Sequence, residues 1–129
     1  MTAAPTPQIE RIGQIYVTAH DLDRAVRFYR DTLGLPFLFQ VPRMAFFDCG
    51  GVRIMLGIPD APEFDHPASI IYYRVADIDA AHQALVRRDV TFRQPPHLVA
   101  RLATFDLYLA DFQDSEGNAL ALMSEVAKA

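Results

Sequence analysis

The sequence predicts an α+β fold in which two βαβββ modules form one eight-stranded cupped mixed sheet, with the helices on its outside. One reason is size, because 129 residues with 51% hydrophobic and 22% charged side chains suit a single packed domain. The other is an internal repeat. The segment Asp21-Leu22-Asp23-Arg24-Ala25 recurs as Asp77-Ile78-Asp79-Ala80-Ala81, and Gly51 and Leu56 recur as Gly117 and Leu122. Neither unit can bury its sheet alone, so we expect the two to pack together.

Local signals place the elements of the first unit. Residues 11–18 alternate between apolar and polar side chains, which is typical of a half-buried strand. Asp21 is a good helix N-cap, apolar side chains then recur at helical spacing, and Gly34 predicts the end of the helix. Three β-rich runs follow, and the Gly50-Gly51 pair predicts a tight hairpin turn between the last two. These runs cover residues 37–41, 44–48 and 52–58.

The second unit repeats this order after a proline-rich break. Three prolines within residues 59–67 predict a linker. We expect a strand at 69–75, a helix capped by Asp77, and strands near 90–93, 104–112 and 118–124, with a longer excursion around 94–103. The predicted organisation is an extended or disordered N-terminus (1–8), a first module (9–58), the linker (59–67) and a second module (68–126), together one domain.

Composition excludes several classes of function. The net charge is −4 and Lys and Arg do not cluster, so we expect no nucleic-acid partner. No apolar run approaches the roughly 20 residues that cross a bilayer, and residues 1–8 lack the features of a signal peptide. Cys49 is the one cysteine, which rules out an intrachain disulfide. These features predict a cytoplasmic protein without a membrane partner.

Four stretches carry a resemblance to a known family. They are Gln14-Ile15-Tyr16-Val17, the run from Asp21 through Arg27-Phe28-Tyr29 to Leu33-Gly34-Leu35, Val75-Ala76-Asp77-Ile78-Asp79-Ala80-Ala81, and Phe112-Gln113-Asp114-Ser115-Glu116-Gly117-Asn118. In these the chain resembles the vicinal-oxygen-chelate superfamily, which includes glyoxalase I, bleomycin-resistance proteins and extradiol dioxygenases. The last turn departs from the family pattern, which usually has Pro and Asp at the positions of Ser115 and Glu116. The resemblance implies a homodimer whose cup is completed by the partner.

The same resemblance implies four metal-ligand positions, one on each of four strands. In this chain they are Gln14, Met55, Ile70 and Ala121. Divalent transition metals need oxygen, nitrogen or thiolate donors in a fixed geometry, and Ile and Ala offer none. We therefore expect that the family metal site is lost and that no cofactor is bound. The cup would then be apolar.

Strand alternation places further side chains in the cup. Tyr16, Tyr72 and Met123 share the face of the four positions, Arg53 and Arg74 could reach its mouth, and Tyr108, with Asp106, could also reach it. Glu125 shares this alternation but lies near the chain end. His97 lies in the excursion that interrupts the repeat, where a functional loop is expected, and an imidazole there could act as an acid or base.

Three functions remain open at this point. The first is a metal-independent protein that binds a small hydrophobic or aromatic compound, as drug-sequestering relatives do. The second is a metal-independent lyase or isomerase that uses His97 as acid or base. The third is a metal-dependent lyase or dioxygenase with a relocated site, for example at Gln14, His97 and Asp106. Ordinary packing of these side chains in a smaller core is the alternative to all three.

Overall fold

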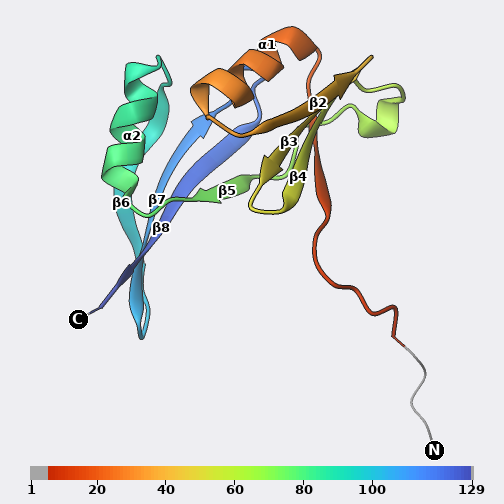
Figure 1. The fold of residues 1–129 in the computed structure, drawn as a ribbon. Helices are drawn as coiled ribbons and strands as arrows, with labels where there is room; N and C mark the ends of the chain where they lie inside the picture. The colour runs from red at the N-terminus through yellow and green to blue at the C-terminus, as the bar shows by residue number, and fades with distance from the viewer. Residues whose placement is uncertain (1–5, 129) are drawn as a thin grey trace, which may run out of the picture.

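The computed structural model describes residues 6–128 and contains the βαβββ unit twice (Figure 1). The first half contains β1 (Gln14–Thr18), α1 (Leu22–Arg27), the π-helical turn η1 (Phe28–Thr32), β2 (Phe37–Val41), β3 (Met44–Cys49) and β4 (Val52–Gly57). After the 3₁₀ turn η2 (Pro62–Phe64), the second half contains β5 (Ile71–Arg74), α2 (Ile78–Arg87), β6 (Phe92–Arg101), β7 (Phe105–Gln113) and β8 (Ala119–Ala127). The predicted fold class and the predicted repeat are confirmed.

The eight strands divide into two four-stranded sheets. The first has the order β1-β4-β3-β2 and the second the order β5-β8-β7-β6. In each sheet the strand that begins the half pairs in parallel with the strand that ends it, β1 with β4 and β5 with β8. Strands β1 and β5 are therefore both edge strands. The single continuous sheet expected from the sequence is not formed by strand pairing among residues 6–128.

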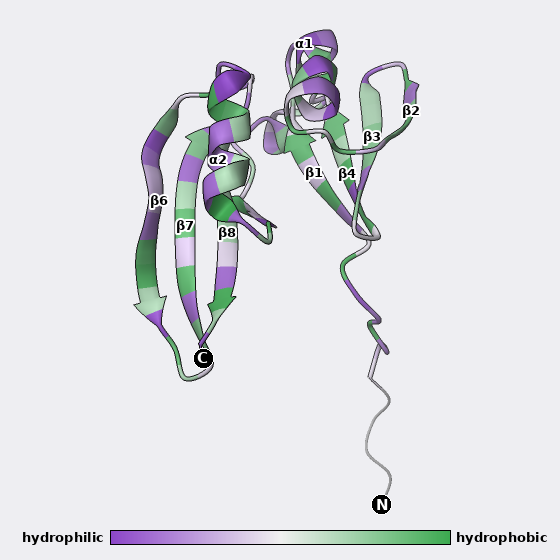
Figure 2. Cartoon of the chain, turned by 60° about the vertical axis from the view of Figure 1, so that its left-hand side comes forward, coloured by the Kyte–Doolittle hydropathy of each residue, from purple (hydrophilic) through white to green (hydrophobic). Residues whose placement is uncertain are grey.

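Each helix covers the sheet of its own half. Helix α1 packs on β3 and β4, and α2 packs on β6, β7 and β8 (Figure 2). The predicted caps are confirmed: Asp21 accepts a hydrogen bond from the Arg24 backbone N–H at 3.1 Å, and Asp77 accepts one from Ala80 at the same distance. The repeated aspartate therefore caps the N-terminus of both helices in the same way.

The longest departure from the sequence prediction is β6. Residues 94–101 were expected in an irregular excursion but belong to a ten-residue strand that pairs with β7. Its register shifts three times, between Phe92 and Gln94, between Gln94 and His97, and between Leu98 and Ala100. Such bulges disguise the alternation of a strand, and Pro95 and Pro96 are tolerated because β6 is an edge strand. His97 is therefore a strand residue and does not lie in a loop.

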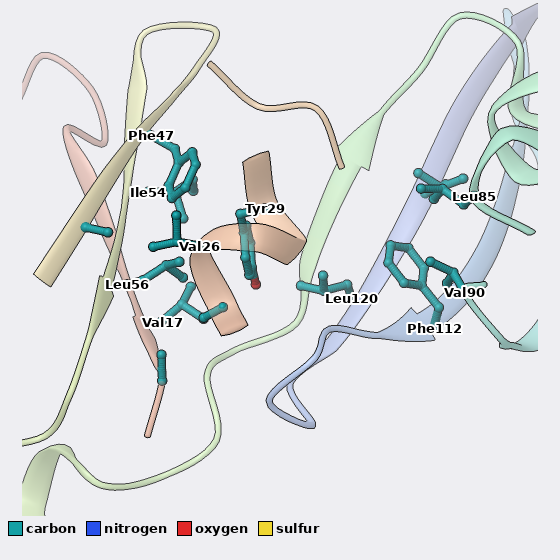
Figure 3. Close-up of a cluster of buried hydrophobic side chains, with 14 of the residues drawn as sticks. Val17, Val26, Tyr29, Phe47, Ile54, Leu56, Leu85, Val90, Phe112 and Leu120 are labelled. Atoms are coloured by element: carbon teal, nitrogen blue, oxygen red, sulfur yellow. The ribbon is translucent and has the colours of Figure 1, made fainter. Parts of the chain in front are cut away.

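One hydrophobic core runs through both halves. Figure 3 shows one group of side chains around Val17 and Leu56 and another around Leu85 and Phe112. Tyr29 and Leu120 lie between them, and both are fully buried. The halves therefore share their interior and form one packing unit.

A buried polar network also joins the halves. The Tyr29 hydroxyl donates to the Asp114 carboxylate at 2.6 Å. The same carboxylate accepts from the Asn118 side chain and from the backbone N–H groups of Glu116 and Asn118, each at 2.8 Å. The Asn118 amide then donates to the Thr18 carbonyl at 3.0 Å. Burial, together with the Asp114 charge, raises the pKa of Tyr29, so this phenol stays a donor.

Glu116 extends this junction at the start of α1. Burial opposes ionisation, but hydrogen bonds from Arg24, Ser115 and the Asp21 backbone N–H lower the pKa of Glu116. Its two oxygens accept from the Arg24 guanidinium at 2.8 and 3.1 Å. Ser115 and Glu116, where the chain departs from the family pattern, lie in a turn of the second half. Through Glu116 this turn binds the start of α1 in the first half.

The N-terminal segment of the described chain lies outside the two sheets. Residues 6–13 carry no helix or strand and lead away from the sheets (Figure 1). The extended segment predicted for residues 1–8 falls mostly outside the described residues, and the module boundaries stay a prediction. No helix within residues 6–128 combines the length and the apolar character needed to cross a membrane.

Candidate functional site

Each sheet has one face against its helix and one face turned away from it, which we call the cup face. The cup face of the first sheet carries an aromatic and methionine surface. Register places Tyr16 and Phe46 on either side of Met55, and Phe39 stacks on Phe46 with ring centroids 4.4 Å apart. The first cup face consists of Gln14, Tyr16, Phe39, Phe46, Arg53 and Met55.

Polar groups at its open end are already paired with one another. The Arg53 guanidinium donates to Gln14 Oε1 at 2.8 Å and lies over the Phe46 ring, 5.4 Å from its centroid. The Gln14 amide nitrogen donates to the Met55 sulfur at 3.5 Å. Arg53 therefore orients Gln14 across the apolar surface.

Tyr16 closes the other end of this face. Its ring lies so close over the Gly57 backbone that a Cβ there would approach Tyr16 Cε2 to 2.5 Å. The hydroxyl donates to the Gly57 carbonyl at 3.0 Å. Burial raises the pKa of Tyr16, so the phenol remains protonated. Glycine at position 57 therefore leaves the room that the Tyr16 ring occupies.

The second cup face contains a hollow of about 170 Å³. It brings together two of the four family ligand positions, Ile70 and Ala121, with the predicted residues Tyr72 and His97. Ile70, which directly precedes β5, and Tyr72 on β5 are about half exposed, at 53% and 48%. The second cup face consists of Ile70, Tyr72, His97, Leu109, Asp111 and Ala121.

His97 has one ring nitrogen engaged and one left over. Its Nδ1 is 2.8 Å from the Pro95 carbonyl oxygen, a group that can only accept. That contact assigns the proton of the neutral imidazole to Nδ1 and leaves Nε2 as an acceptor. Opposite it on β7 stands Leu109, and Asp111 pairs with Arg93 at the rim.

Two other predicted residues lie further along the second sheet. Arg74 and Met123 are partners in the β5–β8 register. The Arg74 guanidinium is 3.7 Å from the Glu125 carboxylate and its side chain is largely exposed. Alternation therefore places all three on the cup side, away from the hollow itself.

The predicted position of Tyr108 in the cup is wrong. Tyr108 stands opposite Ser124 on β8, and Ser124 is buried on the helix side of the sheet. Asp106 has the same alternation and shares that side. Bulges can reset which residues of a strand face which side, so the alternation along β7 was uncertain from the sequence. In the structure Leu107 and Leu109, on either side of Tyr108, are the residues that face the cup.

Sequence reasoning also missed several residues that the structure brings to the two faces. Leu109 and Asp111 were missed for the same reason, because the alternation along β7 was uncertain from the sequence. Phe46 and Phe47 are adjacent aromatic residues, so alternation alone does not tell which one faces the core. Pairing of Phe46 with Met55 decides it, and Phe47 is fully buried on the helix side.

The donor set at the family metal positions does not fit a divalent metal. Gln14 Oε1 is engaged by Arg53, Met55 supplies a thioether, and Ile70 and Ala121 have no donor atoms. No hydrogen bond, ion pair or aromatic contact within residues 6–128 joins the first cup face to the second. Across the same residues, no three His, Cys, Asp or Glu side chains gather in a metal-binding arrangement.

Comparison with known proteins places this geometry in a family. The model of the Glyoxalase/Bleomycin resistance protein/Dioxygenase superfamily matches residues 11–122. The chain belongs to this superfamily. The matched region includes every residue that defines the two cup faces. None of the curated proteins matches the chain at a significant level.

Solved structures of the superfamily share the fold over nearly the whole chain. A member from Sphaerobacter thermophilus DSM 20745 is 26% identical with a TM-score of 0.77, and the match covers 91% of this chain and 98% of that one. A member from Nocardioides is 20% identical with a TM-score of 0.73, covering 100% and 89%. Lactoylglutathione lyase from Agrobacterium tumefaciens is 22% identical with a TM-score of 0.73, covering 90% and 94%.

Proposed function

We propose that this superfamily member binds a small aromatic or hydrophobic molecule on its cup faces without a metal, in the cytoplasm. The observation that carries the proposal is the hollow on the second cup face, where half-exposed Ile70 and Tyr72 surround Ala121. Apolar walls with a few convergent polar groups are typical of small-molecule sites. His97 Nε2 and Asp111 supply those polar groups here.

The proposal includes a second copy of the chain. The first cup face is aromatic, and Phe39 on its surface is 45% exposed. Strands β1 and β5 both have an unpaired edge, and unpaired edges are usually protected by further pairing. A two-fold dimer that sets β1 of one copy beside β5 of the other would face the first cup face toward the second. The ligand would then lie between Tyr16, Phe46 and Met55 of one copy and Tyr72 of the other.

A charge placed in the hollow tests the binding function. Screening of neutral aromatic compounds by ligand-observed NMR identifies a binder, whose affinity is then measured for variants. We expect Ile70→Asp to weaken binding by about tenfold or more, because an apolar ligand that covers the carboxylate would remove its hydration without replacing it. Val86→Asp is the matched control, since Val86 is similarly exposed on α2. Equal affinities for the two variants would contradict the proposal.

Removal of metal provides the second arm of this test. We expect the affinity of the parent protein to be the same before and after dialysis against EDTA, because the donor atoms do not suit a divalent metal. Binding that is lost with EDTA and restored by a transition-metal ion would instead support the relocated metal site.

A second candidate function, a metal-independent lyase or isomerase, is favoured by His97. Its Nε2 is an acceptor held at the wall of the hollow, which is where a general base would stand. If it acts as a base on a bound compound, His97→Gln should lower kcat by about 100-fold or more and change KM only slightly. A fall in affinity with no measurable turnover in either protein would identify His97 as a binding residue.

A further inference from the structure

One arginine on the first cup face carries a charge that no carboxylate of the described chain neutralises. Arg53 takes part in none of the ion pairs that this part of the chain forms. On the cup side of the second sheet, by contrast, Arg74 pairs with Glu125 at 3.7 Å and Arg93 pairs with Asp111. The Arg53 guanidinium is therefore the cup-face cation that is left without a counter-charge.

The strand partner of Arg53 does not supply that charge. Asp48 stands opposite Arg53 in the β3–β4 register. One oxygen of its carboxylate accepts a hydrogen bond from the Gly51 backbone N–H at 3.2 Å, so Asp48 serves the hairpin turn. An anion for Arg53 would therefore come from outside the chain.

Contacts within the chain hold Arg53 in one orientation. Its Nε donates to Gln14 Oε1 at 2.8 Å, and the guanidinium carbon lies 5.4 Å from the centroid of the Phe46 ring. Because a guanidinium can only donate, Gln14 presents its oxygen to Arg53 and its amide nitrogen to the Met55 sulfur. The two Nη groups donate to no acceptor in the described chain. They are free to donate side by side to one carboxylate.

Closure of the proposed dimer increases the need for an anion. Arg53 is exposed in the single chain, where water hydrates its charge. In the dimer the second cup face of the other copy would cover it, and Asp111 on that face is already paired with Arg93. A charge that loses its hydration and gains no partner opposes association. A bound anion would offset this effect.

From these contacts we infer that the cup binds a small aromatic carboxylate and that Arg53 holds the carboxylate group. The inference rests on the proposed cup function and names the class of its ligand. The carboxylate accepts from the two Nη groups, and the ring lies against Met55 and Tyr16. One unpaired guanidinium matches a single negative charge, which favours a carboxylate over a dianionic phosphate. A guanidinium then supplies the positive charge beside Gln14 that a metal ion would otherwise supply.

Two probes that differ in charge test the inference. They are trans-cinnamate and its neutral amide, cinnamamide, titrated in the presence of EDTA and followed by ligand-observed NMR. We expect cinnamate to bind the parent protein about tenfold more tightly than cinnamamide, because hydrogen bonds between charged groups are stronger than neutral ones by about this factor.

Three variants assign the effect to Arg53. Arg53→Gln should lower the affinity for cinnamate about tenfold and leave the affinity for cinnamamide unchanged. Gln14→Glu should have the same effect, because its carboxylate would pair with Arg53 in place of the ligand. Arg27→Gln is the matched control, since it removes the same charge from an exposed position on α1. It should change neither affinity.

The outcomes separate this inference from the cup function on which it rests. Equal affinities for the two probes, both lowered by Ile70→Asp, would overturn the carboxylate and leave the cup function standing. Tighter binding of cinnamate that persists in the Arg53→Gln variant would overturn the role of Arg53. The absence of saturable binding by either probe would overturn the inference together with the cup function.

Discussion

Replacing Asp114 with alanine is expected to remove about 3–5 kcal/mol from the free energy of unfolding. The Asp114 carboxylate is 7% exposed and accepts four hydrogen bonds, from Tyr29, Glu116 and both nitrogens of Asn118. The substitution would leave these donors without an acceptor inside the core, and each unsatisfied donor costs about 1–3 kcal/mol. A loss of this size is a large share of the roughly 5–15 kcal/mol that folds a domain.

Urea unfolding followed by circular dichroism measures this effect. We expect the midpoint to fall while the slope m stays the same, because the surface exposed on unfolding does not change. Asp31→Ala is the matched control, since Asp31 forms an exposed ion pair with Arg30 at 2.8 Å. A midpoint for Asp114→Ala as high as that of Asp31→Ala would show that the network does not hold the halves together.

Tyr29→Phe tests the same network from the other half. This variant keeps the ring in the core and removes one donor, so it should cost only about 0.5–1.5 kcal/mol. The order Asp114→Ala, then Tyr29→Phe, then Asp31→Ala follows from what each change removes, which is four buried hydrogen bonds, one buried hydrogen bond and one exposed ion pair. Any other order would contradict the assignment.

The sequence predicted the parts of the fold that local chemistry decides. Asp21 and Asp77 cap their helices through their own side chains, and that signal needs no other part of the chain. By contrast, β6 is held by pairing with β7, and its three register shifts remove the period of two that would reveal it. The same bulges explain why the position of Tyr108 was predicted wrongly.

The sequence could predict which side chains share a cup face, because strand alternation and register decide that. Gln14, Tyr16 and Met55 share a face because the parallel pairing of β1 with β4 sets Tyr16 beside Met55. The family resemblance had placed Gln14 and Met55 there, and strand alternation had placed Tyr16. The contacts of Arg53 with Gln14 and Phe46 depend on side-chain conformation and could not be read from spacing. Whether the eight strands form one sheet or two depends on contacts between the halves, which sequence patterns do not report. Because they form two sheets, the proposed cup needs a second copy of the chain to bring the two cup faces together.

A proline at position 72 is expected to abolish the proposed dimer and to leave the fold intact. The Val75 backbone N–H donates to the Met123 carbonyl at 2.9 Å, so alternation assigns Ile71, Tyr73 and Val75 to the β8 ladder. Tyr72 and Arg74 then turn their peptide groups to the open edge of β5. Proline at an edge position removes only the outward N–H group.

In the unpaired edge of β1, in the first sheet, alternate peptide groups also point outward. Arg53 donates to the Gly13 carbonyl and Ala19 donates to the Gly57 carbonyl, at 3.0 and 2.9 Å, so the odd-numbered residues of β1 serve β4. The peptide groups of Gln14 and Tyr16 therefore face outward. The two open edges thus belong to residues whose side chains line the cup faces, and pairing of the edges would close the cup at the same time.

Analytical ultracentrifugation over a range of protein concentrations measures the outcome. We expect Tyr72→Pro to sediment as a folded monomer where the parent protein is a dimer, and to lose affinity for the cup ligand. Tyr72→Val, which keeps the N–H group, should remain dimeric. Tyr73→Pro should unfold, because it removes a ladder hydrogen bond to β8. A folded Tyr72→Pro variant that still dimerises would show that the copies do not meet through the β5 edge, and the cup would then need a different closure.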